Sequence, residues 1–255
     1  IPRGMRVLSA ENPPIRYSSL PWEWESGERP EFETLRGWQN LDEVVSGSTN
    51  EFDAQVKLMH HAIKRWIDGG VLPDFPAWNA LDILKHIDRT GGGGMCLQNN
   101  LLLAGFCQAF GWQARHVNVV SHEVCEVWND DFAKWIYLDA HRAGHYMFDP
   151  DTVEPMSVLD LHRAYLDKYF PGRSIDWMKD TLVYPLEGEP FASRGSLTSH
   201  GGKSFDEYCR PAFVKMIPRT NWLEKPFPRP LNHGMSQWPW DGYINWYDED
   251  RKSVV

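Results

Sequence analysis

The sequence lacks any uninterrupted apolar run of the roughly 20 residues that a membrane-spanning helix requires. It also lacks a basic excess, because 35 Asp and Glu outnumber 26 Lys and Arg and give a formal net charge of −9. A nucleic-acid-binding groove needs a concentrated basic stripe. We therefore expect a globular protein with no membrane span and no nucleic-acid partner.

Cysteine is also scarce, and its spacing is uninformative. The four cysteines include no C-x-x-C pair, which zinc ribbons require, and they form no regular disulfide framework. We expect no metal and no other cofactor, while a disulfide involving Cys107 or Cys125 stays open. The chain begins Ile1-Pro2-Arg3 without an initiator methionine or an apolar leader, so its compartment stays unknown. A secreted or periplasmic protein whose signal peptide has been removed is one expectation.

Tryptophan, in contrast, is abundant, with 13 residues concentrated toward the two ends of the chain. Its side chain buries a large apolar surface and keeps a polar N–H, which suits both core packing and sugar-binding platforms. We expect most of these residues to pack. In the C-terminal segment, Trp238, Trp240 and Tyr243 are candidate substrate-binding residues because Asp241 lies among them and a carboxylate can bind sugar hydroxyls.

The length of 255 residues and the 42% hydrophobic content allow one large domain, and no Gly/Ser-rich linker divides the chain. Residues 1–48 show no sustained periodicity, which predicts an irregular Trp- and Pro-rich extension on the surface. Residues 49–170 hold the regular patterns and are the predicted core. Residues 171–255 predict a β-rich or irregular C-terminal extension packed on that core, with a second small domain as the alternative.

Apolar residues three and four apart predict three helices within the core. The first begins after Thr49 or Asn50 and ends before Gly69, the second covers about residues 81–90, and the third runs from Cys96 to Phe110 with Gly111 as its C-terminal cap. A fourth helix is predicted to start at Ser157, because Ser157 and Asp160 have capping-box spacing.

Beyond Gly111 the period changes from helical to alternating. Alternation covers residues 114–120, 123–128 and 135–140, with polar turns between these segments. This predicts three consecutive antiparallel strands.

Cys96 follows a run of four glycines and opens the third predicted helix. A helix N-terminus carries unpaired N–H groups and about half a positive charge, which stabilise a thiolate, the reactive form of cysteine. We therefore expect Cys96 to be a nucleophile. The other three cysteines are expected to be buried small hydrophobes.

A cysteine nucleophile needs a base and a group that orients the base. His122 stands at the head of the second predicted strand, and Asp139 ends the third. Hairpin neighbours would bring the start of one strand beside the end of the other. The pattern therefore predicts a site of Cys96, His122 and Asp139.

The combined motif resembles the transglutaminase-like superfamily, a papain-related cysteine fold. The resemblance covers about residues 49–150 and is carried by Gly94-x-Cys96, the run Gly111 to Arg115, His122 with Glu126-Val127, and Trp135-x-x-x-Asp139. It implies an α+β core in which the cysteine helix packs on an antiparallel sheet. It also implies a triad with Cys96 as nucleophile, His122 as base and Asp139 as orienting group.

The chain departs from the family pattern at two positions. Val124 stands where family members often carry an aromatic residue. After the third strand, family members often have Asp-Pro, whereas this chain has Asp139-Ala140. Neither change removes a catalytic group. The resemblance therefore implies the chemistry and leaves open whether the substrate is a peptide, a protein or a glycan.

Further substrate contacts are expected around the predicted triad. An indole N–H from Trp78 is a candidate oxyanion-hole donor beside the backbone N–H of Cys96, and Gln98 and Asn99 lie in the first turn of the cysteine helix. A role in the core is the alternative for Trp78, and capping or solvent exposure is the alternative for the two amides.

The segment after the third predicted strand also holds polar residues. His141 and His145 are candidate substrate contacts at the mouth of the site, while the cluster that they form with Asp139 and Asp149 fits no established zinc spacing. A polar loop is the alternative. Arg115 and Glu126 are expected to form a structural charge pair or to lie at a strand edge.

Three functions stay open at this point. The first is a cysteine-dependent hydrolase or acyltransferase acting on an amide bond through a thioester, with hydrolysis favoured because nothing identifies calcium loops or an amine-acceptor site. The second is a carbohydrate-active enzyme, a polysaccharide lyase or glycan hydrolase, that reuses the fold with an aromatic sugar-binding cleft. The third is a non-catalytic binding module, which the presence of all three triad residues disfavours.

Overall fold

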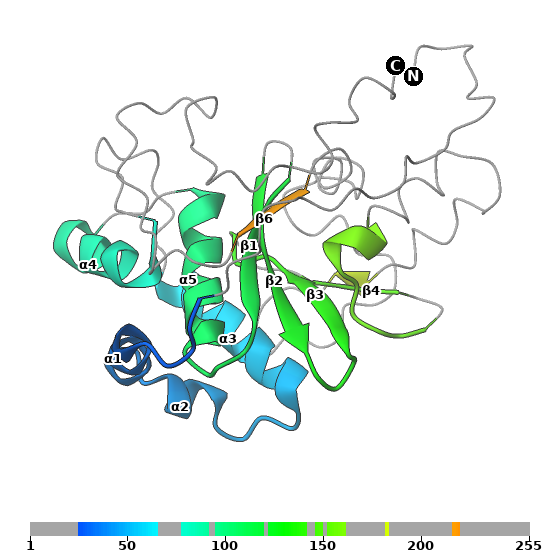
Figure 1. Ribbon diagram of the computed structural model, residues 1–255, viewed down its shortest axis with the longest axis horizontal. Helices are drawn as coiled ribbons and strands as arrows, with labels where there is room; N and C mark the ends of the chain where they lie inside the picture. The colour runs from blue at the N-terminus through cyan, green and yellow to red at the C-terminus, as the bar shows by residue number, and fades with distance from the viewer. Residues whose placement is uncertain are drawn as a thin grey trace, which may run out of the picture.

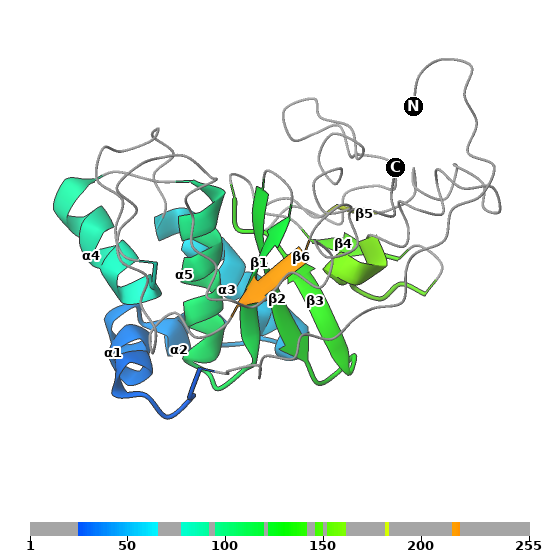
Figure 2. The ribbon, with the colours of Figure 1, turned by 45° about the horizontal axis from the view of Figure 1, so that its top comes forward.

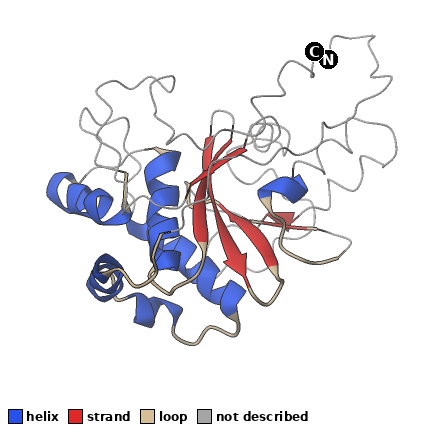
Figure 3. Ribbon diagram, viewed as in Figure 1, coloured by secondary structure: helices blue, strands red, loops and turns tan. Residues whose placement is uncertain are grey.

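The computed structural model describes residues 25–65, 78–91, 95–119, 122–141, 146–149, 152–161, 182–183 and 216–219. Its helices are α1 (Pro30–Trp38), α2 (Leu41–Val45), α3 (Glu51–Arg65), α4 (Ala80–Thr90) and α5 (Cys96–Gln108). Its strands are β1 (Ala114–Val119), β2 (His122–Asn129), β3 (Lys134–Leu138), β4 (Met147–Phe148), β5 (Leu182–Val183) and β6 (Met216–Arg219). The described chain is therefore α+β, with its named helices before its strands (Figure 1; Figure 3).

The main sheet has the order β3-β2-β1-β6, and every neighbouring pair is antiparallel. The three consecutive antiparallel strands predicted after Gly111 are confirmed. Val119 pairs with His122 at the β1–β2 turn, and Cys125 pairs with Leu138. This register carries the start of β2 toward the end of β3.

Helix α5 is the centre of the described fold. It contacts β1 and β2 and also α1, α3 and α4, and Figures 1 and 2 show it between the sheet and α4. Residues 97–107 are all buried, as expected for a helix with neighbours all round. A Cβ on Gly105 would lie 2.5 Å from the Cβ of Ala80, so glycine permits the close approach of α4.

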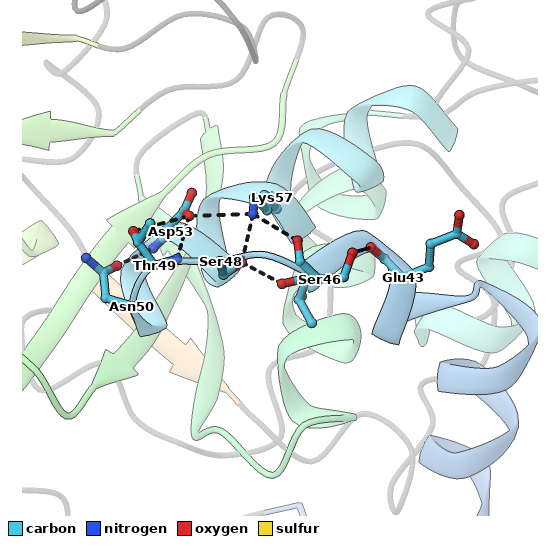
Figure 4. Close-up of polar contacts among 8 residues, drawn as sticks. Glu43, Ser46, Ser48, Thr49, Asn50, Asp53 and Lys57 are labelled. Carbon is cyan, nitrogen blue, oxygen red and sulfur yellow. Dashed lines mark hydrogen bonds and ion pairs between the residues drawn. The ribbon is translucent and has the colours of Figure 1, made fainter.

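Local capping explains where the helices begin and end. In α4, Asn79 Oδ1 accepts from the Asp82 N–H at 2.9 Å, and Gly91 ends the helix with a φ of +65°. In α3, Asn50 Oδ1 accepts from the Asp53 N–H at 2.8 Å. Lys57 on α3 donates to Ser48 Oγ at 3.0 Å, fastening the connection from α2 (Figure 4).

The predicted capping box at Ser157 is confirmed in both directions. The Asp160 N–H donates to Ser157 Oγ at 3.0 Å, and the Ser157 N–H donates to Asp160 Oδ2 at 3.0 Å. Residues 158–161 are helical. This short turn covers part of the sheet, because its Val158 N–H donates to Glu126 Oε1 at 2.8 Å.

The expectation of an irregular surface segment over residues 1–48 is wrong for residues 30–45, which form α1 and α2. Pro30 at the first position of α1 suits a helix start, and Phe32, Leu35 and Leu41 are buried in the hydrophobic core. These helices have 9 and 5 residues, too few for a repeated apolar stripe. Their stability comes from packing.

Most of the C-terminal extension lies outside the described residues. The two short strands β5 and β6 come from it, and β6 pairs with β1 at the edge of the main sheet. No helix in the described parts of the chain is long and apolar enough to cross a membrane.

Candidate active site

Cys96 is the first residue of α5, directly after the extended N-cap residue Met95. It is partly exposed, whereas Cys107 and Cys125 are buried. Burial raises the pKa of both buried thiols well above the ordinary range, which disfavours their thiolates. Among the three cysteines that the structure describes, Cys96 is thus the one placed to react. The fourth, Cys209, lies outside the described residues.

The antiparallel pairing of β2 and β3 brings His122 to Asp139. His122 Nε2 lies 2.5 Å from Asp139 Oδ2, although 17 residues separate them in the chain. The Asp139 carboxylate is fully buried, while the imidazole retains 14% exposure. The pair therefore consists of a carboxylate that is shielded from solvent and an imidazole that reaches the surface.

Cys96 joins this pair. Burial alone would lower the pKa of His122, but the charge and hydrogen bond of Asp139, followed by the hydrogen bond and charge of Cys96, raise it well above its ordinary value. Because Nε2 faces Asp139, we infer that Nδ1 is the ring nitrogen that faces the sulfur. The structure thus brings together the three residues that the sequence motif predicted.

Several groups hold the Asp139 carboxylate. Its Oδ1 accepts from Asn100 Nδ2 at 2.9 Å and from the His141 N–H at 2.8 Å. Its Oδ2, which faces His122, lies 3.4 Å from the Tyr137 hydroxyl. Sequence reasoning missed Asn100, although its spacing of four residues after Cys96 places both on one face of the helix.

Of the two histidines expected at the mouth of the site, the structure describes His141. Its ring centroid lies 5.6 Å from that of His122, with 61° between the planes. His141 therefore borders the triad, and its contact with a substrate stays a prediction. His145 lies outside the described residues.

The three other expected contacts near Cys96 have buried positions. Gln98 is 1% exposed, and its Oε1 accepts from the Met95 N–H at 2.8 Å, which is a capping role. Asn99 is fully buried, and Trp78 is 1% exposed within the hydrophobic core. The structure supplies structural roles for Gln98 and Trp78, and substrate contact by any of the three stays a prediction. Trp238, Trp240 and Tyr243 lie outside the described residues.

Two further pairs of basic and acidic side chains lie on β1 and β2. His116 Nε2 and Glu123 Oε2 are 2.6 Å apart and fully buried. Arg115 donates to Glu126 Oε2 at 2.6 Å and stacks 3.9 Å from the centre of the Trp135 ring. The expectation that Arg115 and Glu126 form a structural charge pair is confirmed by this contact.

Nothing in the described ranges forms a group of three or more His, Cys, Asp or Glu side chains that could hold a metal ion. Asp139, His141 and Asp149, the described members of the polar cluster after the third strand, therefore form no such group. Comparison with known proteins adds no assignment, because no family model and no curated protein matches the chain.

Proposed function

We propose that this protein is a cysteine-dependent hydrolase or acyltransferase that acts on an amide bond through Cys96, His122 and Asp139. The observation that carries the proposal is the 2.5 Å contact between His122 Nε2 and the buried Asp139 carboxylate, together with the hydrogen bond between His122 and the partly exposed Cys96. Acyl transfer by cysteine uses a nucleophile that is hydrogen-bonded to a base, and a third group that is hydrogen-bonded to the base and orients it.

The fold supports the same interpretation. Cys96 opens a helix that packs on β1 and β2, His122 begins β2, and Asp139 directly follows the neighbouring antiparallel strand β3. This is the arrangement that the transglutaminase-like, papain-related resemblance implies. We propose that fold for the core.

In the first chemical step, His122 Nδ1 takes the thiol proton and the Cys96 sulfur attacks the carbonyl carbon of the amide. The carbonyl oxygen gains the negative charge. Backbone N–H groups in the first turn of α5 have no intrahelical acceptor, so they are suited to stabilise that oxyanion. Asp139 stabilises the imidazolium that forms meanwhile.

The second step breaks the C–N bond. His122 returns its proton to the departing amine nitrogen, and a thioester is left on Cys96. Water then gives up a proton to His122 and attacks the thioester, which releases a carboxylic acid and restores the thiol. An amine in place of water would complete an acyl transfer, and hydrolysis is the outcome that we favour.

The test measures the alkylation rate of Cys96 by iodoacetamide against pH, followed by intact mass. The variants are His122→Ala and, as a control, His86→Ala, which removes another buried histidine on α4. We expect fast labelling that persists below pH 8 in the wild type and the control and is lost in His122→Ala. Amide substrates are then screened with Cys96→Ala as the inactive reference.

Labelling that follows an ordinary free thiol in all three proteins would contradict the proposal. Turnover of an amide substrate that survives in Cys96→Ala would contradict the thioester mechanism itself. Free-thiol labelling would favour the carbohydrate-active alternative, because that function does not depend on the thiol.

A further inference from the structure

Asn100 is a fully buried amide at the junction of the three elements that carry the site. Its Nδ2 lies 2.9 Å from Asp139 Oδ1, 2.7 Å from the Glu123 carbonyl oxygen and 3.0 Å from the Cys96 carbonyl oxygen. Its Oδ1 accepts from the Ala140 N–H at 2.9 Å. One side chain therefore contacts the residue of the nucleophile, the start of β2 and the end of β3.

The chemistry of these partners requires an amide. The nitrogen side faces three acceptor oxygens, and the oxygen side faces a backbone donor, so the orientation of the amide is determined. A carboxylate of the same shape would face Asp139 and two carbonyls with no hydrogen to donate. An apolar side chain would leave buried polar groups without this partner, which is costly.

We propose that Asn100 is a positioning residue of this site, which holds the Asp139 carboxylate so that Oδ2 faces His122 and fastens the Cys96 end of α5 to that carboxylate. The inference rests on the proposed function. Asp139 Oδ1 accepts from both Asn100 and the His141 backbone, which fixes the rotation of the carboxylate and leaves Oδ2 for the imidazole.

A purely structural role is the rival explanation, and the chain offers a matched control for it. Asn129 is also fully buried, at the other end of β2. Its Nδ2 donates to Gln55 Oε1 at 3.1 Å, and its Oδ1 accepts from the Phe132 N–H at 3.1 Å. It thus joins a helix to the sheet, as Asn100 does, without contacting the triad.

The first experiment compares Asn100→Ala with Asn129→Ala. Both should lower the free energy of unfolding, but only Asn100→Ala should slow Cys96 alkylation at pH 7, by about tenfold, because a misplaced catalytic group can cost up to about 10²-fold. Equal alkylation rates in wild type and Asn100→Ala, or equal slowing by Asn129→Ala, would overturn the inference.

Asn100→Asp provides a rescue that a structural role does not predict. Two carboxylates that share a site resist double ionisation, so a protonated acid at position 100 can donate to Asp139 at low pH. The ratio of its alkylation rate to that of the wild type should rise toward one between pH 8 and pH 5. A constant ratio would count against positioning. The titratable groups near the pair are His122, Cys96, His141, the Tyr137 hydroxyl and the buried Cys125 thiol.

One measurement needs no variant of Asn100 to fold. In the wild type, the side-chain amide NMR signal of Asn100 should shift across the same pH range as the His122 ring, and the Asn129 signal should not. An Asn100 signal whose chemical shift stays constant through that titration would overturn the inference.

The failure of this inference can be distinguished from the failure of the proposed function. If Cys96 alkylates like a free thiol in both the wild type and His122→Ala, the proposed function fails and this inference fails with it. If wild-type Cys96 is labelled fast and Asn100→Ala is labelled at the same rate, only the inference about Asn100 fails and the proposed function stands.

Discussion

Two histidine–carboxylate pairs lie at the same sheet. Their contact distances are nearly equal, but they differ in burial and in their further partners. His122 and Asp139 are 2.5 Å apart, and His116 and Glu123 are 2.6 Å apart. His116 and Glu123 are both fully buried, whereas the His122 side chain keeps 14% exposure. A short contact between an imidazole and a carboxylate is therefore not enough to mark an active site.

The difference lies in the third partner. His122 has Cys96 as a second hydrogen-bond partner, begins β2 and keeps a partly exposed side chain. His116 lies within β1, between two neighbouring strands. We infer that the first pair is built for proton transfer and that the second stabilises the sheet. The predictions below separate these roles.

The largest expected effect is on stability, from the fully buried pair. Glu123→Ala should lower the free energy of unfolding by about 1–3 kcal/mol, because it removes the close polar neighbour of a fully buried His116 side chain. His122→Ala should cost less, since His122 borders the surface. Urea denaturation of both variants checks the order. A smaller loss in Glu123→Ala than in His122→Ala would reverse our assignment of the two pairs.

The second effect is on reactivity, from the partly exposed pair. Asp139→Asn keeps the shape of the side chain but removes the charge that orients and stabilises the imidazolium, so Cys96 alkylation at pH 7 should slow by about tenfold or more. Folded Glu123→Gln should label at the wild-type rate. Equal rates in Asp139→Asn and wild type would show that the carboxylate does not support His122.

The comparison also shows what could be predicted from sequence. The His122–Asp139 contact was predictable because alternation located two adjacent strands and both residues stand where their strands meet. Cys96 was predictable because glycines and then an apolar pattern mark a helix start. Each of these inferences uses local periodicity and a short connection.

The partners of buried polar residues could not be predicted in this way. Asn100 meets Asp139 across 39 residues, and the contact depends on how α5 packs on the sheet. His116 and Glu123 depend on strand register, since a shift of one residue would turn either side chain to the opposite face. Helices α1 and α2 were missed because they are stabilised by packing on the core rather than by a pattern of their own.

The smallest effect that we predict is a difference in pH dependence. The pKa of His122 is raised well above 6.5 in the folded protein, where Asp139 is its main charged partner and Cys96 and His141 also border the ring. The resulting stabilisation is fully present below about pH 6.5 and is lost as the pH rises through the folded-state pKa, by about 1.4 kcal/mol for each pKa unit. Asp139→Asn removes the main cause of the shift. Its free energy of unfolding should therefore fall less than that of the wild type between pH 6 and pH 9, and parallel curves would show that the pair is not linked to folding.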